Sequence, residues 1–203
     1  MKENERISDG VVCLADVQRK SVDFLWEPYI AIGKLTDLVG NPGDGKSTFV
    51  GKIVSHLSHG FGLPGQTTGE VKKSLILTCE DDPDDTLRPR LEDMGANLEN
   101  IYIYPKTYKF DKKWLDDLRT LIRDLNVGFL VIDPIQSYIG QLDMNRANDI
   151  RSVLAPLAVM SAENQVATLI VRHMNKMQGG NALYRGLGSI DFVGAVRSSL
   201  LLG

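Results

Sequence analysis

Gly40-Asn41-Pro42-Gly43-Asp44-Gly45-Lys46-Ser47 decides the fold of this chain. It fits the phosphate-loop pattern G-x-x-x-x-G-K followed by Ser or Thr, which also occurs by chance and so depends on its context. Residues 35–39 before it are short and largely apolar, as in a buried strand, and the apolar residues after it recur at helical spacing. Strand, glycine-rich turn and helix in this order favour a nucleotide site over an ordinary turn with a surface lysine.

The residue types in this loop suit a bound phosphate. Its glycines permit unusual backbone angles and let the main chain approach a ligand closely. The first N–H groups of the following helix have no partner within the helix, so they can face phosphate oxygens. Lys46 can reach the β- and γ-phosphates of ATP, and Ser47 can hold Mg²⁺. We therefore expect ATP and Mg²⁺ as cofactors.

Composition limits the classes of function. The length of 203 residues suits one domain, and a hydrophobic fraction of 43% is ordinary for a globular core. The net charge of −3 excludes a globally basic nucleic-acid binder, so any such contact must come from a local patch. Cys13 and Cys79 have no metal-ligand spacing, and no apolar run approaches the ~18 residues of a membrane span. We expect a reduced, cytoplasmic protein with no membrane partner.

An acidic run follows the second apolar segment, which ends at Cys79. Asp82 is suited to cap a helix that begins at Pro83, and this explains the later acids of the run without a catalytic role. Glu80 differs, because it lies where a strand ends. Ligands of open α/β sheets bind at that edge, so Glu80 is suited to polarise an attacking water.

Two later strand ends add candidates. Residues 128–132 are apolar and end on Asp133, the form expected of a Walker B acid that holds the water shell of Mg²⁺ beside Ser47. The alternative for Asp133 is an aspartate that caps the turn at Pro134. Another strand ends at Arg172-His173, and either side chain is suited to sense the γ-phosphate. An ordinary strand-end histidine remains the alternative for His173.

Strands alternate with helices through the rest of the chain. We expect strands at 35–39, 71–79, 101–104, 128–133, 166–171 and 198–202. We expect helices after the loop, from 83 to about 94, after Asp111 to 125, at 148–162 and at 189–197. This βαβ spacing predicts an α/β fold, with a mostly parallel twisted sheet and helices on both faces.

On these residues, the chain resembles the RecA-type P-loop ATPases. Within that group it is most similar to the hexameric replicative helicases of the plasmid RepA kind and to the ATPase domains joined to phage and plasmid primases. The stretches that carry the resemblance are spread over nearly all of residues 33–203: Gly40–Thr48, 77–82, 130–134, 170–176 and 184–189.

The resemblance implies roles for individual residues. Glu80 would be the catalytic carboxylate and Asp133 the Walker B acid, with Lys46 in the catalytic site. His173 would couple the nucleotide state to a DNA-facing loop. The nucleotide-binding segment would extend through Thr48.

The resemblance also implies partners. Such ATPases assemble as homo-oligomers, here expected to be a hexameric ring, and bind single-stranded DNA through loops that face the central hole. The matching loops would be 136–145 and 174–184. With net charge −3, the DNA contact should be confined to loop cations such as Lys176 and Arg185.

Domain boundaries follow from the same comparison. Residues 1–32 would form a partly disordered N-terminal arm, and 33–203 the RecA-like ATPase domain. Within the arm, residues 23–30 are aromatic and contain Pro28, and they could dock on the body or on a neighbouring subunit; packing on the body is the favoured reading.

Two features depart from the family pattern. Asp44 puts a carboxylate inside the phosphate loop, so its side chain must turn away from the phosphates. The family's trans-acting Lys or Arg finger lies on a strand after the one ending near Leu202, and that strand is absent from 33–203. Arg185 and Arg197 are basic substitutes, although neither matches the finger position.

The function predicted from these observations is Mg²⁺-dependent ATP hydrolysis coupled to single-stranded DNA binding or translocation, as in a helicase-like or recombinase-like motor. Two alternatives remain open. One is a module that binds ATP to regulate assembly and turns over little. The other is a small-molecule P-loop kinase, which would need an Arg-rich lid that the sequence does not show.

Overall fold

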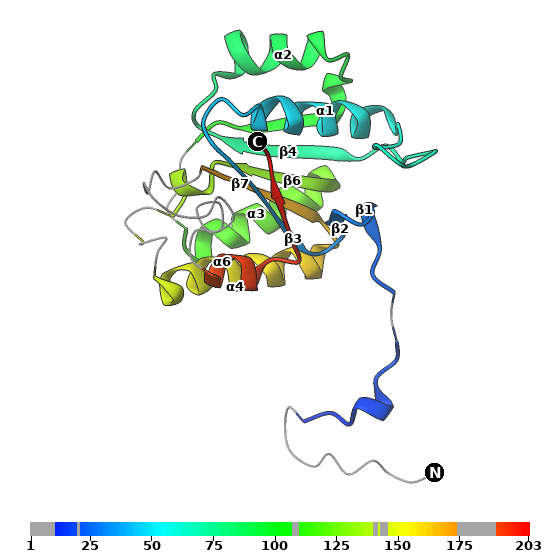
Figure 1. Ribbon diagram of the computed structural model, residues 1–203, viewed down its shortest axis with the longest axis vertical. Helices are drawn as coiled ribbons and strands as arrows, with labels where there is room; N and C mark the ends of the chain where they lie inside the picture. Colours follow the sequence, from blue (N-terminus) through cyan, green and yellow to red (C-terminus); the bar gives the residue numbers. More distant parts are fainter. Residues whose placement is uncertain (1–10, 20, 107–109, 140–141, 143–145, 174–189) are drawn as a thin grey trace.

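A six-stranded parallel sheet forms the centre of the molecule. The computed structural model describes residues 11–19, 21–106, 110–139, 142, 146–173 and 190–203. The strand order is β5-β4-β6-β7-β3-β8 (Figure 1). The strands are β3 (Leu35–Gly40), β4 (Lys73–Thr78), β5 (Ile101–Tyr104), β6 (Val127–Asp133), β7 (Ala167–His173) and β8 (Ser198–Leu201). Each neighbouring pair is parallel, which confirms the predicted α/β fold.

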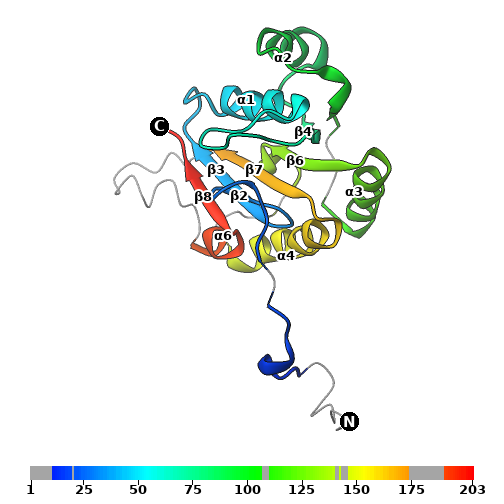
Figure 2. The same ribbon diagram turned by 90° about the vertical axis from the view of Figure 1, so that its right-hand side faces the viewer.

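Helices cover both faces of this sheet (Figures 1 and 2). One face carries α1 (Lys46–His59) and α2 (Arg88–Asp93), and the other carries α3 (Lys112–Leu125), α4 (Ala147–Asn164) and α6 (Ile190–Ala195). Four short turns complete the described helical elements: η1 (Leu14–Asp16), η2 (Pro83–Leu87), η3 (Leu98–Asn100) and η4 (Ile135–Ser137).

Alternation along the central strand β6 explains the two apolar layers. Phe129 and Val131 belong to the core that contains α1, whereas Leu130 and Ile132 belong to the core that contains α3 and α4. All four side chains are fully buried. A strand buried on both faces reads as a continuous apolar run, because successive side chains point to opposite sides.

Local capping fixes where the helices begin and end. The predicted N-caps are confirmed: Asp111 accepts a bond from Trp114 N at 2.8 Å, and Asp82 accepts one from Asp84 N at 3.0 Å. The turn after Asp82 is a π-type turn that leads into α2. Helices α1 and α3 end at Gly60 and Asn126, both in the left-handed conformation that closes a helix.

A small antiparallel pair, β1 (Phe24–Trp26) and β2 (Ile30–Ala31), was not predicted as strands. It packs on the body. The Trp26 indole donates to Pro64 O at 2.9 Å and lies 5.9 Å from the Phe49 ring. Residues 11–19 lead away from the sheet (Figure 2). The expected disorder of residues 1–10 lies outside the described residues.

Strand register brings the predicted strand ends to one edge. Asp133 of β6 pairs with Thr78 of β4, two residues before Glu80. His173 of β7 pairs with Gly40 of β3, where the phosphate loop begins. The carboxyl ends of β4, β6, β7 and β3 therefore lie at the same edge of the sheet. No helix within the described ranges is both long and apolar enough to cross a membrane.

Candidate active site

The loop after β3 has an open backbone that fits phosphate groups. Gly43 and Gly45 have φ of +89° and +87°, which residues with a Cβ rarely adopt. A Cβ built at either position would meet no atom within 4 Å, so the space beside both is open. Helix α1 begins at Lys46 without a capping side chain, which leaves its first N–H groups for a ligand.

Lys46 is a buried cation held by main-chain oxygens. Its Nζ donates to Gly40 O at 2.8 Å and to Asn41 O at 2.7 Å, and the residue is only 6% exposed. It has no carboxylate partner within the described residues. A buried ammonium without a counter-ion is costly in free energy, and a bound polyphosphate would supply the missing negative charge.

Asp44 forms two hydrogen bonds with Asn41 at the start of the phosphate loop. Its Oδ2 accepts the N–H of Asn41 at 2.5 Å, and its own N–H donates to Asn41 O at 3.2 Å. The carboxylate thus bonds the first turn of the loop, and the orientation of its side chain away from the phosphates stays a prediction.

Gly40 requires glycine for a different reason from Gly43 and Gly45, namely the close approach of a neighbouring segment. A Cβ at Gly40 would lie 2.8 Å from Leu202 O, and Leu202 N donates to Val39 O at 2.8 Å. The loop therefore begins directly against the chain that follows β8.

The first three acids after β4 differ in their surroundings. Asp81 and Asp82 bond to nearby groups of their own segment, whereas Glu80 lies beside another strand end. Asp81 accepts from Arg90 Nη1 at 2.6 Å, and Asp82 caps the following turn. Glu80 lies with Oε2 3.7 Å from His173 Nε2, and its side chain is 53% exposed. Of these three acids, only Glu80 combines exposure with a neighbour from another strand end of the site.

Asp133 ends β6 among like charges. Burial raises the pKa of its carboxyl from 3.8 to about 6, and the nearby carboxylates of Glu80 and Asp81 also raise it, while His173 and Lys46 lower it. The charges of Glu80, Lys46 and His173 thus act on one carboxyl group, which indicates that the strand ends converge on it. Such a site favours a bound cation that relieves the repulsion.

Arg172 and His173 are adjacent in the sequence, but their side chains have different surroundings in the structure. His173 is 37% exposed beside Glu80, and its Nδ1 has no hydrogen-bond partner among the described residues. Arg172 is 4% exposed and forms a bidentate pair with Asp37 of β3. Of the two predicted candidates for the γ-phosphate sensor, the structure favours His173, because the Arg172 guanidinium is bound to a buried carboxylate.

A magnesium ion would depend on ligands from a bound nucleotide. Among the described residues, no group of three or more His, Cys, Asp and Glu side chains is placed to hold a metal ion. Ser47, in the first turn of α1, and Asp133 are oxygen donors of the kind Mg²⁺ prefers, and this ion keeps several waters and takes phosphate oxygens. The residues present therefore fit Mg-ATP better than a free ion.

Most of the predicted DNA contacts belong to segments outside the described residues. Lys176, Arg185 and the loop 174–184 lie outside the described residues. The other predicted DNA loop, 136–145, is described only in part. Near its beginning Tyr138 and Ile139 are buried, and the Tyr138 hydroxyl has no hydrogen-bond partner in the described structure.

Asp37 is a charged residue that the sequence reasoning missed. It is fully buried in β3, where it binds Arg172 and accepts from Ser199 Oγ at 3.1 Å. The available signal was an acid inside an otherwise apolar strand, which requires a buried partner.

Comparisons with known proteins agree with this geometry. A family model described as an AAA domain matches residues 2–179. The DNA repair protein RadA of Streptococcus pyogenes serotype M3 is 26% identical over 148 residues, which cover 71% of this chain and 28% of RadA. The DNA repair protein RadA of Chlamydia muridarum is 26% identical over 147 residues, which cover 71% of this chain and 29% of RadA. The chain thus spans less than a third of the length of these relatives.

Among solved structures, the KaiC-like protein PH0186 from the hyperthermophilic archaeon Pyrococcus horikoshii OT3 has a similar fold. Its TM-score is 0.59 at 20% sequence identity, and the match covers 90% of this chain and 80% of that one. At this identity the likeness shows the fold alone. The expected RecA-like architecture is confirmed.

Proposed function

This chain belongs to the AAA domain family of RecA-type P-loop ATPases, and from that membership we propose that it hydrolyses ATP with Mg²⁺ and couples hydrolysis to single-stranded DNA. The observation that carries the proposal is the meeting of four titratable groups at one sheet edge: Lys46, His173 and Glu80 all act on the carboxyl of Asp133, and His173 Nε2 lies 3.7 Å from Glu80. Positive charge for a phosphate, an acid for the metal and an exposed carboxylate are the parts that phosphoryl transfer needs.

The phosphate loop binds and neutralises the nucleotide. The main-chain N–H groups from Gly43 to Ser47 surround the phosphates, and the ammonium of Lys46 moves from the loop oxygens to the β- and γ-phosphates. When bound, Mg²⁺ withdraws charge from those phosphates. Ser47 and Asp133 are the residues that would hold this ion.

Glu80 and His173 act at the open side of the site. Glu80 orients the attacking water and accepts its proton, a role suited to a carboxylate that is half exposed and lies beside His173 at the same sheet edge as the phosphate loop. His173 Nε2 lies 3.7 Å from Glu80, so movement of either side chain affects the other. His173 thereby reports the state of the γ-phosphate to the segment that follows β7.

The DNA part of the proposal has separate support. Relatives that match 71% of this chain are named DNA repair proteins. The segments after β6 and β7 leave the same edge of the sheet as the nucleotide site, so nucleotide state and DNA contact can be linked there. We propose a homo-oligomeric ring, hexameric as in replicative helicases, with Lys176 and Arg185 as DNA contacts.

The decisive experiment compares three acids of one run. Glu80→Gln should retain nucleotide binding and lose about 10²–10⁴ in turnover, because a water-orienting carboxylate is removed. Asp81→Asn and Asp82→Asn are matched controls, since Asp81 pairs with Arg90 and Asp82 caps a turn. Turnover is measured with and without single-stranded DNA, and ATP binding by calorimetry.

The outcomes separate the alternatives. A silent Glu80→Gln with a damaging Asp81→Asn or Asp82→Asn would move the catalytic role to another acid. Tight ATP binding with negligible turnover, whether or not DNA is present, would identify the chain as a nucleotide-binding regulator. Brisk turnover that DNA does not change would retain the ATPase and remove the DNA partner.

A further inference from the structure

A buried ionic cluster lies one residue from the proposed sensor His173. The Arg172 guanidinium on β7 donates through Nε to Asp37 Oδ1 at 2.8 Å and through Nη2 to Asp37 Oδ2 at 2.7 Å. Arg172 is 4% exposed and Asp37 is fully buried. Ser199 of β8 donates to the same carboxylate at 3.1 Å. Three neighbouring strands therefore meet on one pair of charges.

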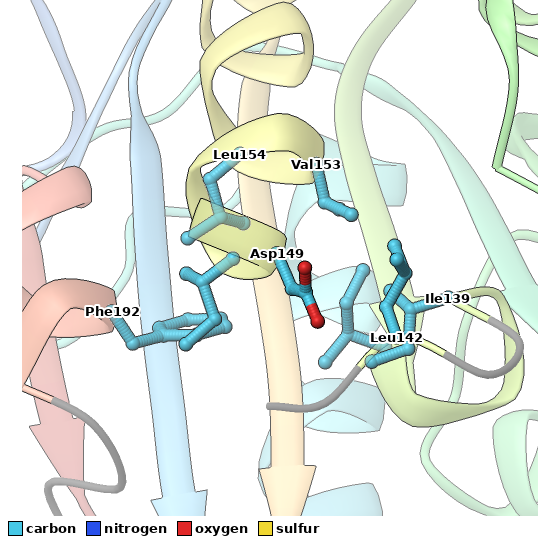
Figure 3. A pocket seen from close by; sticks show the side chains of 8 residues that line it. Ile139, Leu142, Asp149, Val153, Leu154 and Phe192 are labelled. Atoms are coloured by element: carbon cyan, nitrogen blue, oxygen red, sulfur yellow. The ribbon is translucent and has the colours of Figure 1, made fainter. Parts of the chain in front are cut away.

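The cluster extends to the helix before β8. The guanidinium carbon of Arg172 lies 4.4 Å from the centre of the Phe192 ring on α6. Phe192 also lines an apolar hollow against η4 and α4. Figure 3 shows its ring on one side of that hollow and Ile139 and Leu142 on the other. Arg172 thus connects β7 to the neighbouring strand β3 and to helix α6.

The register of β7 against β3 connects the Arg172–Asp37 pair to the proposed nucleotide site. His173 follows Arg172 directly and pairs with Gly40, the first residue of the phosphate loop. Successive side chains of a strand point to opposite faces, so fixing Arg172 against Asp37 fixes the opposite direction for His173. The rigid planar fork of an arginine determines orientation more strictly than a lysine ammonium does.

Stability alone is a weak reason for such a pair. Apolar side chains of similar volume often stabilise a core as well as a buried ion pair does, because both charges must lose their water. We propose that Arg172 is a positioning residue: its pairing with Asp37 sets the place of His173 beside Glu80 and the phosphate loop. This inference rests on the proposed ATPase function.

The first test is Arg172→Lys, which keeps the charge and loses the fork. Because the phosphate loop is untouched, KM for ATP should change by no more than about threefold, whereas kcat should fall by about 10- to 100-fold. Arg119→Lys is the matched control: Arg119 pairs with Asp116 at 2.7 Å on α3, away from the site, and its kcat should stay unchanged. A kcat of Arg172→Lys equal to that of the wild type overturns the inference.

The second test is a double-mutant cycle of Arg172→Lys with His173→Ala. If Arg172 acts through His173, the lysine substitution should cause no further loss of kcat once the imidazole is gone. Losses that multiply would assign Arg172 a separate role and overturn the inference, as would a His173→Ala protein with wild-type turnover. Absence of ATP turnover in the wild type would instead refute the proposed function itself.

A third measurement does not depend on activity. The chain has only three histidines, so the imidazole signals in a proton NMR spectrum can be assigned with His173→Ala. The His173 signals should shift in Arg172→Lys and in the paired apolar variant Asp37→Leu/Arg172→Met, while those of His56 and His59 stay in place. Unchanged His173 signals in both proteins would show that the cluster does not set its position.

Discussion

Lys46 and Arg172 are both buried cations in strand-end regions of one sheet, and they are neutralised in different ways. Arg172, 4% exposed, is bound bidentately by a carboxylate. Within the described part of the chain, Lys46, 6% exposed, forms hydrogen bonds only with the main-chain oxygens of Gly40 and Asn41. Carbonyl oxygens partly replace water around an ammonium but do not cancel its charge.

The difference indicates which cation is available to an anionic ligand. A guanidinium already paired with a carboxylate has little to gain from a phosphate, because the phosphate would have to displace Asp37. The Lys46 ammonium gains a counter-ion when polyphosphate binds. Burial of a cation therefore points to a ligand site only after its protein partners have been identified.

The largest expected effect is on the free energy of unfolding, which should respond differently to removal of the two cations. Arg172→Met should lower the free energy of unfolding by about 3–5 kcal/mol, because Asp37 is left buried without its partner. Lys46→Met removes a buried charge that forms no ion pair with the described residues, so the nucleotide-free protein should be at least as stable as the wild type. Denaturant unfolding without nucleotide measures both. Equal losses in the two variants would contradict the comparison.

The next effect concerns nucleotide. Lys46→Ala should weaken Mg-ATP binding and reduce turnover by about 10²–10³, because preorganised charge at the β- and γ-phosphates is lost. Lys52→Ala is the matched control, since Lys52 lies exposed on the same helix. Calorimetric titration and steady-state turnover give the two readings. If Lys46→Ala matches the control in both, the site assignment fails.

A smaller effect is expected from pH. Burial and neighbouring carboxylates raise the pKa of Asp133 from 3.8 to about 6 in the metal-free protein. Between these values the folded state keeps a proton that the unfolded chain has lost, so stability falls as pH rises through that window and stays reduced above it. Asp133→Asn should remove this component and be more stable than wild type at pH 8 by up to about 3 kcal/mol.

Unfolding curves at several pH values, recorded with chelator, test this prediction. The difference between variant and wild type isolates Asp133 from the other acids, and Asp117→Asn on the exposed face of α3 supplies a control. A difference that does not vary between pH 4 and pH 8 would show that the Asp133 carboxyl is not perturbed by its surroundings.

The smallest effect concerns a cation expected at the surface. If Lys176 contacts one DNA phosphate, Lys176→Ala should reduce the log–log salt slope of single-stranded DNA binding by about 0.7. Lys52→Ala should leave the slope unchanged. Fluorescence titrations at several salt concentrations provide the slopes, and an unchanged slope and affinity in Lys176→Ala would remove that residue from the DNA contact.

Sequence reasoning predicted the parts of the fold that depend on local pattern. The phosphate loop stands between a strand and a helix, and acids follow β4 and end β6, because apolar runs and helix signals are short-range features. The register that makes Thr78 level with Asp133 is not written in either segment alone. That register depends on the order of the strands in the sheet, and the alternation of strands and helices along the sequence does not specify this order.

The Asp37–Arg172 pair was beyond such reasoning for a related reason. Its members are 135 positions apart, and β7 lies beside β3 only because the crossover from β6 places β7 between β6 and β3. The sequence held a partial signal, since adjacent strand residues face opposite ways and Arg172 and His173 could not both face one ligand. The β1–β2 pair was missed because strands of three and two residues carry almost no periodicity.

The contact between Gly40 and Leu202 has a consequence for how the loop tolerates mutation. Gly43 and Gly45 are restricted by their own backbone angles, so their requirement for glycine is intrinsic. Gly40 is restricted by a neighbouring carbonyl 2.8 Å from where its Cβ would lie, so its requirement is conditional on the chain after β8. A mutational scan would score the three glycines alike, yet only the first should show epistasis with changes around Leu202.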